Sequence, residues 1–145
     1  DWNELLLKFN KKKFVKTKTK SLFHIPINMG TVFARTYSDI HAINAQTDDD
    51  IIVLSKDTST WTAEHYFSVN KDVPGYEVVE FDGWFITKVF EGPYKETRNW
   101  ISDMDQYVQS KGYQPKEKYF FYTTCPKCAK YYGKNYVVAV WQVET

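Results

Sequence analysis

Apolar and polar positions in the second half of the chain follow two different periods. Residues 84–90 form a run of aromatic and β-branched side chains that is typical of a strand. Within residues 95–111 the apolar positions recur at helical spacing, and Gly112 provides a C-terminal stop. Two more strand-like runs follow, at residues 119–124 and 136–143. This order predicts one strand–helix–strand–strand unit.

The first half of the chain reads as short strands separated by polar segments. Residues 38–50 are small, polar and not periodic, so no helix is predicted between these strands. A mostly antiparallel sheet with one or two packed helices is therefore expected, which is an α+β fold. The strands expected here occupy residues 22–27, 31–37, 51–54, 61–69 and 78–90.

The first twenty residues form a basic segment. Apolar positions between Trp2 and Phe9 fall at helical spacing, which predicts a short amphipathic helix, with a solvated basic arm as the alternative. A basic amphipathic segment can lie on an anionic membrane, but the solvated arm is favoured and no membrane partner is expected. The chain is expected to consist of this helix or arm at residues 1–20 and a single domain at residues 21–145. The lysines of the segment are Lys8, Lys11, Lys12, Lys13, Lys16, Lys18 and Lys20.

Composition narrows the classes of partner. The net charge of +1 gives no basic surplus of the kind that nucleic-acid binding uses. Aromatic residues make up 18% of the chain, and flat rings line small-molecule pockets as well as cores. No run is long and apolar enough for a membrane span, no secretory signal pattern occurs, and two cysteines are too few for a disulfide framework. A cytoplasmic location is expected.

The strand at residues 61–69 carries the main candidate site residue, Glu64. Strand alternation places Glu64 and Tyr66 on one face and His65 on the other, so Glu64 and His65 cannot act on one substrate atom. A carboxylate among rings is poorly solvated, which raises its pKa and suits proton transfer. If the carboxylate stays ionised, it can instead pair with a cation whose flat body stacks on the rings. The alternative is a solvent-facing Glu on an edge strand, with no functional role.

Cys125 and Cys128 form a Cys-x-x-Cys pair that leaves three interpretations open. The pair can be half of a zinc site, a redox pair or an incidental pair of thiols. Besides carboxylates the chain offers only three histidines as further ligands, so a closed zinc site would need a second subunit. No bound metal and no cofactor are therefore predicted, although a homodimer remains open.

Several segments resemble the GyrI-like small-molecule-binding family. The runs Glu-His-Tyr-Phe-Ser-Val at 64–69 and Ala-Val-Trp-Gln-Val at 139–143 resemble that family's closing strand. The Glu-Gly-Pro-Tyr at 91–94 resembles its strand-to-helix junction. Residues 87–95 and 122–130 are most similar to a small bacterial subgroup that is usually labelled as hydrolases.

The resemblance covers residues 30–143 and implies a duplicated fold. Family members have two strand–helix–strand–strand units joined about a pseudo-two-fold, with a ligand cavity between them. In this chain the first unit is expected to be degenerate, because its helix is not predicted. Ala139 also stands where the family often has Glu, which leaves Glu64 as the only carboxylate at that motif position.

The same resemblance implies the role of Glu64 and of several rings. Such a Glu recognises cationic lipophilic compounds in some members, and in others it is associated with hydrolytic opening of strained rings. The chain is therefore predicted to bind a hydrophobic, cationic ligand in an aromatic cleft; a hydrolase that uses Glu64 to activate water and a non-catalytic interaction module remain alternatives. The candidate ligand-binding rings are Tyr66 and Trp141, followed by Tyr37, Trp84 and Tyr122.

Overall fold

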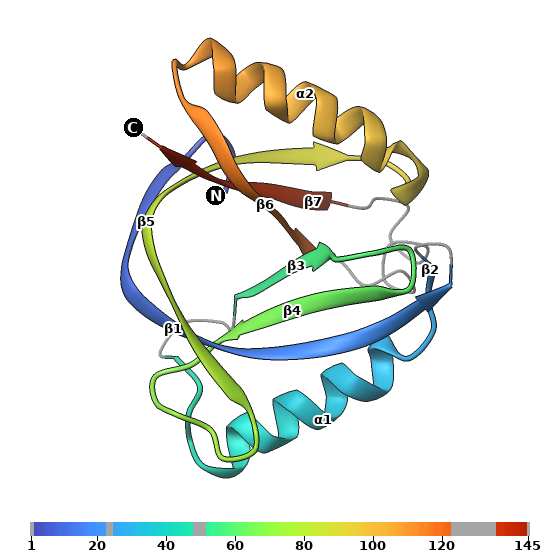
Figure 1. The fold of residues 1–145 in the computed structure, drawn as a ribbon, viewed down its shortest axis with the longest axis vertical. Helices are drawn as coiled ribbons and strands as arrows, with labels where there is room; N and C mark the ends of the chain where they lie inside the picture. The colour runs from blue at the N-terminus through green and yellow to red at the C-terminus, as the bar shows by residue number, and fades with distance from the viewer. Residues whose placement is uncertain (1, 23–24, 48–51, 123–135, 145) are drawn as a thin grey trace. The chain divides into compact units, whose positions relative to one another are not determined.

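The structure is a computed structural model that describes residues 2–22, 25–47, 52–122 and 136–144 (Figure 1). It has an α+β fold with long antiparallel strands and two α-helices, as the sequence predicts. Neither helix is long and apolar enough to cross a membrane within the described part of the chain. The elements are β1 (Leu6–Leu22), β2 (Ile25–Pro26), α1 (Met29–Ala42), β3 (Val53–Asp57), β4 (Thr62–Ser68), β5 (Glu77–Glu91), the short 3-10 helix η1 (Tyr94–Glu96), α2 (Thr97–Ser110), β6 (Gln114–Tyr122) and β7 (Tyr136–Glu144).

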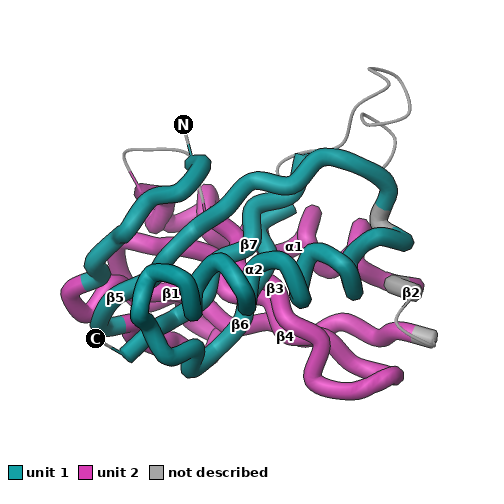
Figure 2. Tube along the Cα trace, turned by 90° about the horizontal axis from the view of Figure 1, so that it is seen from above, with its two compact units in different colours: residues 1–9, 82–145 teal, residues 10–81 magenta. Residues whose placement is uncertain are grey.

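The chain divides into two compact units, which Figure 2 colours separately. Unit 1 consists of residues 1–9 and 82–145, and unit 2 consists of residues 10–81. The long strands β1 and β5 therefore contribute residues to both units.

Unit 2 is a sheet in the order β1-β4-β3 with α1 packed on one face. All the pairings are antiparallel, and His65 on β4 lies between Thr17 on β1 and Ser55 on β3. The buried positions of α1 are Val32, Thr36 and Ile40, spaced four apart as one helical face requires. The core beneath the helix is formed by Val15, Ile40, Ala45, Val53, Phe67, Val69 and Val73.

Unit 1 repeats this construction, with a sheet in the order β5-β7-β6 and α2 on one face. The predicted helix is confirmed, and its buried positions Trp100, Met104 and Val108 are also four apart. The junction before it needs Gly92, whose φ of +139° disfavours any residue with a side chain. The core is formed by Ile86, Phe90, Trp100, Met104, Val108, Phe120, Val137, Ala139, Trp141 and Val143.

The two units show that the strand–helix–strand–strand duplication is complete. The expectation of a degenerate first copy is wrong, because α1 and α2 each have 14 residues. The predicted strand at residues 31–37 is helical instead. Its β-branched and aromatic residues favour a strand locally, and the polar Thr36 interrupts the apolar stripe. Thr36 is accommodated in the helix because its hydroxyl donates to the carbonyl of Val32 at 2.7 Å.

The N-terminal segment is neither a helix nor a solvated arm. Residues Leu6–Leu22 form the 17-residue strand β1, in which Phe14 and Val15 are fully buried. From Lys16 onward the lysines alternate with residues of the other face, so Lys16 and Lys18 lie on the face away from α1 while Thr19 is buried toward it. Tertiary pairing with β4 therefore overrides the helical spacing at the start of the chain.

Candidate functional site

Glu64 lies on β4, the central strand of unit 2, on the face away from α1. The neighbouring positions establish this, because the rings of His65 and Phe67 both contact Phe33 of α1 edge-on, at 4.8 and 5.0 Å. Glu64 and Tyr66 alternate with them and so occupy the opposite face. The prediction that Glu64 and His65 face in opposite directions is confirmed.

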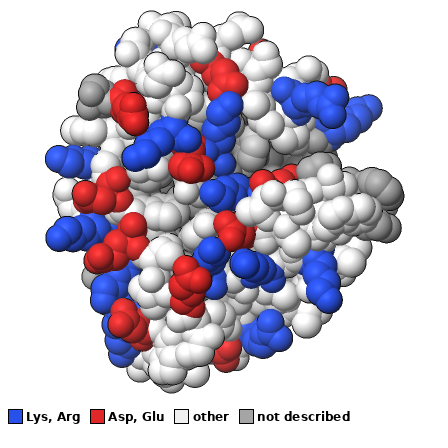
Figure 3. All heavy atoms as spheres, in the orientation of Figure 1, with Lys and Arg blue, Asp and Glu red and all other residues white. Residues whose placement is uncertain are grey.

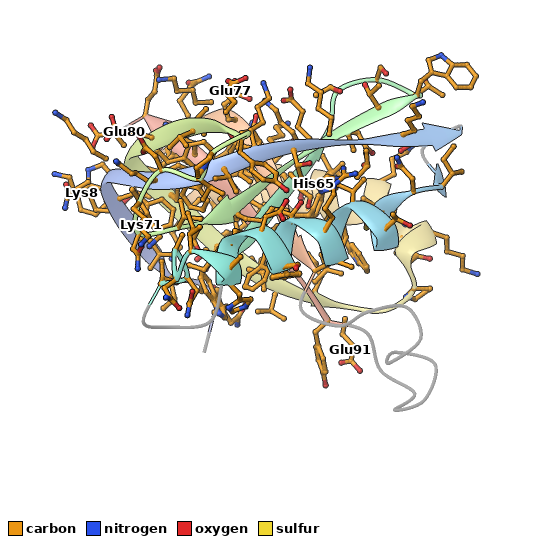
Figure 4. The ribbon with its side chains drawn as sticks, turned by 90° about the horizontal axis from the view of Figure 1, so that it is seen from below. Lys8, His65, Lys71, Glu77, Glu80 and Glu91 are labelled. Carbon is orange, nitrogen blue, oxygen red and sulfur yellow. The ribbon has the colours of Figure 1, made fainter. Side chains whose placement is uncertain are left out.

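Both oxygens of the Glu64 carboxylate have a partner. The Lys16 ammonium lies 2.9 Å from Oε2, and the Tyr66 hydroxyl donates to Oε1 at 2.9 Å. The Glu64 side chain is 13% exposed and that of Lys16 is 21% exposed, so the ion pair is largely shielded from water. Lys16 also lies 4.0 Å from Oε2 of Glu77, an exposed residue of β5 that is labelled in Figure 4.

Tyr66 connects this carboxylate to a series of ring contacts, and lysines flank it on the neighbouring strands. The buried ring of Tyr66 lies 5.1 Å from the ring of Phe81, which in turn lies 4.7 Å from Phe14. In the strand register, Glu64 lies opposite Lys18 of β1 and opposite Lys56 of β3. Figure 3 shows acidic and basic side chains interspersed over its visible face rather than gathered by sign.

The pKa of Glu64 is below its ordinary value. Burial disfavours the carboxylate, but the hydrogen bonds from Lys16 and Tyr66, together with the charges of Lys16 and Lys56, outweigh that effect. The hydrogen bond to Glu64 likewise raises the pKa of Lys16, against the opposing effect of burial. Glu64 is therefore ionised at neutral pH, which fits the ion-pairing role better than the proton-transfer role.

Of the candidate rings, only Tyr66 touches Glu64 in unit 2. Tyr37 lies on α1 and packs edge-on against Phe67 at 5.1 Å, on the helix side of the sheet. Burial raises the pKa of the Tyr37 hydroxyl. Tyr37 is therefore a core residue of unit 2 rather than a neighbour of the Glu64 face.

The three candidate rings of unit 1 all lie on the side of α2. Trp141 is fully buried, and its Nε1 donates to Oδ1 of Asp105 on α2 at 2.7 Å. Trp84 packs against the same core, and Tyr122 stacks on the core ring of Phe120 at 6.1 Å. Trp141 therefore lies on the helix side of its sheet, as Phe67 does in unit 2, whereas Tyr66 lies on the face away from the helix. A one-residue shift between the two strand motifs exchanges the faces of a sheet.

The opposite face of unit 1 carries rings that the sequence interpretation missed. Phe85 is fully buried there and lies 4.9 Å from Phe9, while Phe121 meets Trp2 edge-on at 5.4 Å. Lys16 and Phe81 were missed in the same way in unit 2. Alternation along β4 and β7 would not have found these residues, because they lie on other segments whose register with β4 and β7 is set by tertiary pairing.

His65 belongs to a buried polar cluster beneath α1 (Figure 4). The Ser55 hydroxyl lies 2.7 Å from Nδ1, and the Thr19 hydroxyl lies 2.7 Å from Nε2. Burial lowers the pKa of His65 to about 4, against the opposing charge of Glu64. The neutral imidazole donates through one nitrogen and accepts through the other, so both hydroxyls satisfy a group that is only 1% exposed.

Metal-binding geometry is absent among the described residues, where no group of three or more His, Cys, Asp or Glu residues converges. The predicted candidates Cys125 and Cys128 lie outside the described residues.

Comparison with solved structures places the fold among known ones. A hydrolase from Listeria innocua matches with a TM-score of 0.67 and 13% identity over 99% of this chain and 93% of that one. An uncharacterized conserved protein from the same organism matches with a TM-score of 0.67 and 12% identity over the same shares. The structure of SAV2435 bound to tetraphenylphosphonium matches with a TM-score of 0.51 and 12% identity, over 97% of this chain and 93% of that one. At these identities the likeness shows the fold alone.

A search of curated proteins gave no match. A family model described as "Bacterial hydrolase" does match, and it spans residues 1–143 and therefore both units. On that match, the chain belongs to the bacterial hydrolase family.

Proposed function

We propose that the chain is a GyrI-like domain that binds a small, partly hydrophobic cation at Glu64. The observation that carries the proposal is the Glu64 carboxylate itself, which is 13% exposed, ionised at neutral pH and bonded to the Tyr66 hydroxyl. An ionised carboxylate that is shielded from water attracts a cation more strongly than one in bulk solvent.

The rings beside Glu64 define the type of cation. Tyr66 contacts the carboxylate, its ring centroid lies 5.1 Å from that of Phe81, and the faces of such rings attract a delocalised positive charge. A cation with a large apolar body also loses little hydration when it leaves water. The ligand-bound structure of SAV2435 has the same fold, which supports the choice of tetraphenylphosphonium as the first probe.

Calorimetric titration with tetraphenylphosphonium tests this proposal. Glu64→Gln keeps the shape of the side chain and removes its charge, so affinity should fall by about tenfold or more. Glu80→Gln is the matched control, because Glu80 lies on β5 and is exposed, and its loss should leave affinity unchanged. Equal affinities for the wild type and Glu64→Gln would refute Glu64 as the anchor.

Membership of the bacterial hydrolase family favours a second candidate function at the same residues. Glu64 would then orient or deprotonate a water molecule that adds across the carbon–oxygen bond of a strained ring or an ester. A carboxylate with a lowered pKa is a weak general base, so the binding function has the stronger support.

Turnover separates the two functions. A hydrolase should cleave an activated ester or open an epoxide, and Glu64→Gln should abolish that turnover while changing the affinity for substrate little. If the chain only binds its ligand, neither the wild type nor Glu64→Gln should show turnover above the rate in buffer. Glu64→Gln should then show only the loss of cation affinity described above.

A further inference from the structure

Lys16 lies between two carboxylates of unequal exposure. Its ammonium is 2.9 Å from Glu64, which is 13% exposed, and 4.0 Å from Glu77, which is 66% exposed. The short contact is an ordinary ion pair, whereas the longer one is at the limit of that interaction. Lys16 is therefore bound mainly to the carboxylate that the proposed ligand also needs.

A ligand cation can reach Glu64 only in competition with this ammonium. Tyr66 already donates to Oε1, so Oε2 is the oxygen that Lys16 occupies and that an incoming cation would share. The tethered ammonium also acts at the high effective concentration of an intramolecular partner. A displaced Lys16 would be left poorly solvated unless another anion received it.

Glu77 is suited to receive the displaced ammonium. A movement of the Lys16 side chain by about 1 Å would shorten the 4.0 Å contact to the length of an ordinary ion pair. Lys18 and Lys56 flank Glu64 on the neighbouring strands, and both offer positive charge rather than an alternative acceptor.

We propose that Lys16 is an internal counter-ion which occupies Glu64 in the free protein and transfers to Glu77 when a cation binds. The inference rests on the proposed function, because it assumes that Glu64 is the anchor. It assigns Lys16 the role of a specificity-determining residue: small hydrated ammonium ions, which resemble the lysine head group, do not displace it. Only cations that also stack on Tyr66 and Phe81 gain enough to do so.

Removal of the counter-ion gives the first test. Lys16→Met keeps an unbranched side chain, one heavy atom shorter, and removes the charge, and it should tighten tetraphenylphosphonium binding by roughly fivefold to tenfold. Butylammonium, which should not bind the wild type measurably, should bind Lys16→Met. Unchanged affinity for both cations in a folded Lys16→Met protein would overturn the inference.

A double-mutant cycle with Glu77 gives the second test. Glu77→Gln should weaken tetraphenylphosphonium binding by about twofold to threefold in the wild type and have no effect in the Lys16→Met background. Glu80→Gln on the same strand should have no effect in either background. Glu77 is exposed, so the effect of Glu77→Gln in the wild-type background is measurable even where Lys16→Met lowers the yield of folded protein.

The outcomes separate this inference from the proposed function. If Glu77→Gln weakens binding equally with and without Lys16, Glu77 attracts the ligand directly and the transfer is refuted. If Glu64→Gln leaves the affinity of the wild type unchanged, the anchor itself fails, whatever the Lys16 and Glu77 variants show.

Discussion

Unit 2 and unit 1 have the same order of elements, yet the central strands of their sheets differ. On the face away from the helix, β4 of unit 2 carries Glu64 and Tyr66, whereas β7 of unit 1 carries Val138 and Val140. On the helix side, β4 carries the polar His65, whereas β7 carries Ala139, Trp141 and Val143. Polar chemistry is thus concentrated on the central strand of unit 2.

The duplication therefore sets the arrangement of helix and sheet in each unit, but it does not set which residues the central strand carries. Each unit needs a buried helix face and an antiparallel sheet, and both units meet that need with residues spaced four apart on the helix. The central strand can carry buried polar groups only where partners satisfy them, as Tyr66 and Lys16 do for Glu64.

The largest expected effect is on the free energy of unfolding, and it tests whether Trp141 is a core residue rather than a ligand-binding residue. Trp141→Ala should lower the free energy of unfolding by about 3–5 kcal/mol, because it empties a fully buried position and removes the hydrogen bond to Oδ1 of Asp105. Chemical denaturation measures this loss. The tetraphenylphosphonium affinity of the folded protein should not change. A weakened affinity would place Trp141 in the ligand site and contradict the assignment of ligand binding to unit 2.

The second effect is a pH dependence that belongs to unit 2. The pKa of His65 is about 4 in the folded protein and 6.5 in the unfolded chain, so the unfolded chain takes up the proton first as the pH falls. The stability due to neutral His65 is complete above pH 6.5 and is lost as the pH falls toward 4. The gap between the two values corresponds to about 3 kcal/mol.

Hydrogen exchange locates this acid sensitivity. Between pH 6.5 and 4 the amides of α1, which covers His65, should lose protection before those of α2. His65→Gln should flatten the pH dependence of unfolding. His41→Gln, an exposed histidine in the last turn of α1, is the control and should keep the slope. Simultaneous loss of protection in both helices would contradict the assignment to unit 2.

The smallest effect concerns the hydroxyl of Tyr66. Tyr66→Phe removes the 2.9 Å hydrogen bond to Glu64 and should lower the free energy of unfolding by about 1 kcal/mol. The pKa of Glu64 should move back upward, because that hydrogen bond is one of the interactions that lower it. Titration of the carboxyl by NMR measures the change, and an unaltered pKa would exclude Tyr66 as a partner of the carboxylate.

The sequence predicts unit 1 better than unit 2. In unit 1 the stripe of Trp100, Met104 and Val108 is wholly apolar, and Gly92 marks the entry to the helix. In unit 2 the equivalent stripe contains Thr36, and local β propensity points to a strand. The alternation of Lys16 and Lys18 with buried residues of β1 was hidden in a longer run of lysines.

The candidate site could be predicted only in part. Alternation along β4 is a local property, and it correctly separates Glu64 and Tyr66 from His65. The partnership with Lys16 depends on the register between β1 and β4, which no local pattern reveals. The strand motif that contains Trp141 is shifted by one residue relative to that of Tyr66, so the two rings lie on different faces of their sheets. The face of Trp141 is set by its packing against α2.

A crystal structure of the chain with tetraphenylphosphonium tests the central claim most directly. The cation should lie against the Tyr66 ring with its charge next to the Glu64 carboxylate, and the Lys16 ammonium should have moved from Glu64 to Glu77. A cation bound elsewhere, with the 2.9 Å contact between Lys16 and Glu64 intact, would contradict the account.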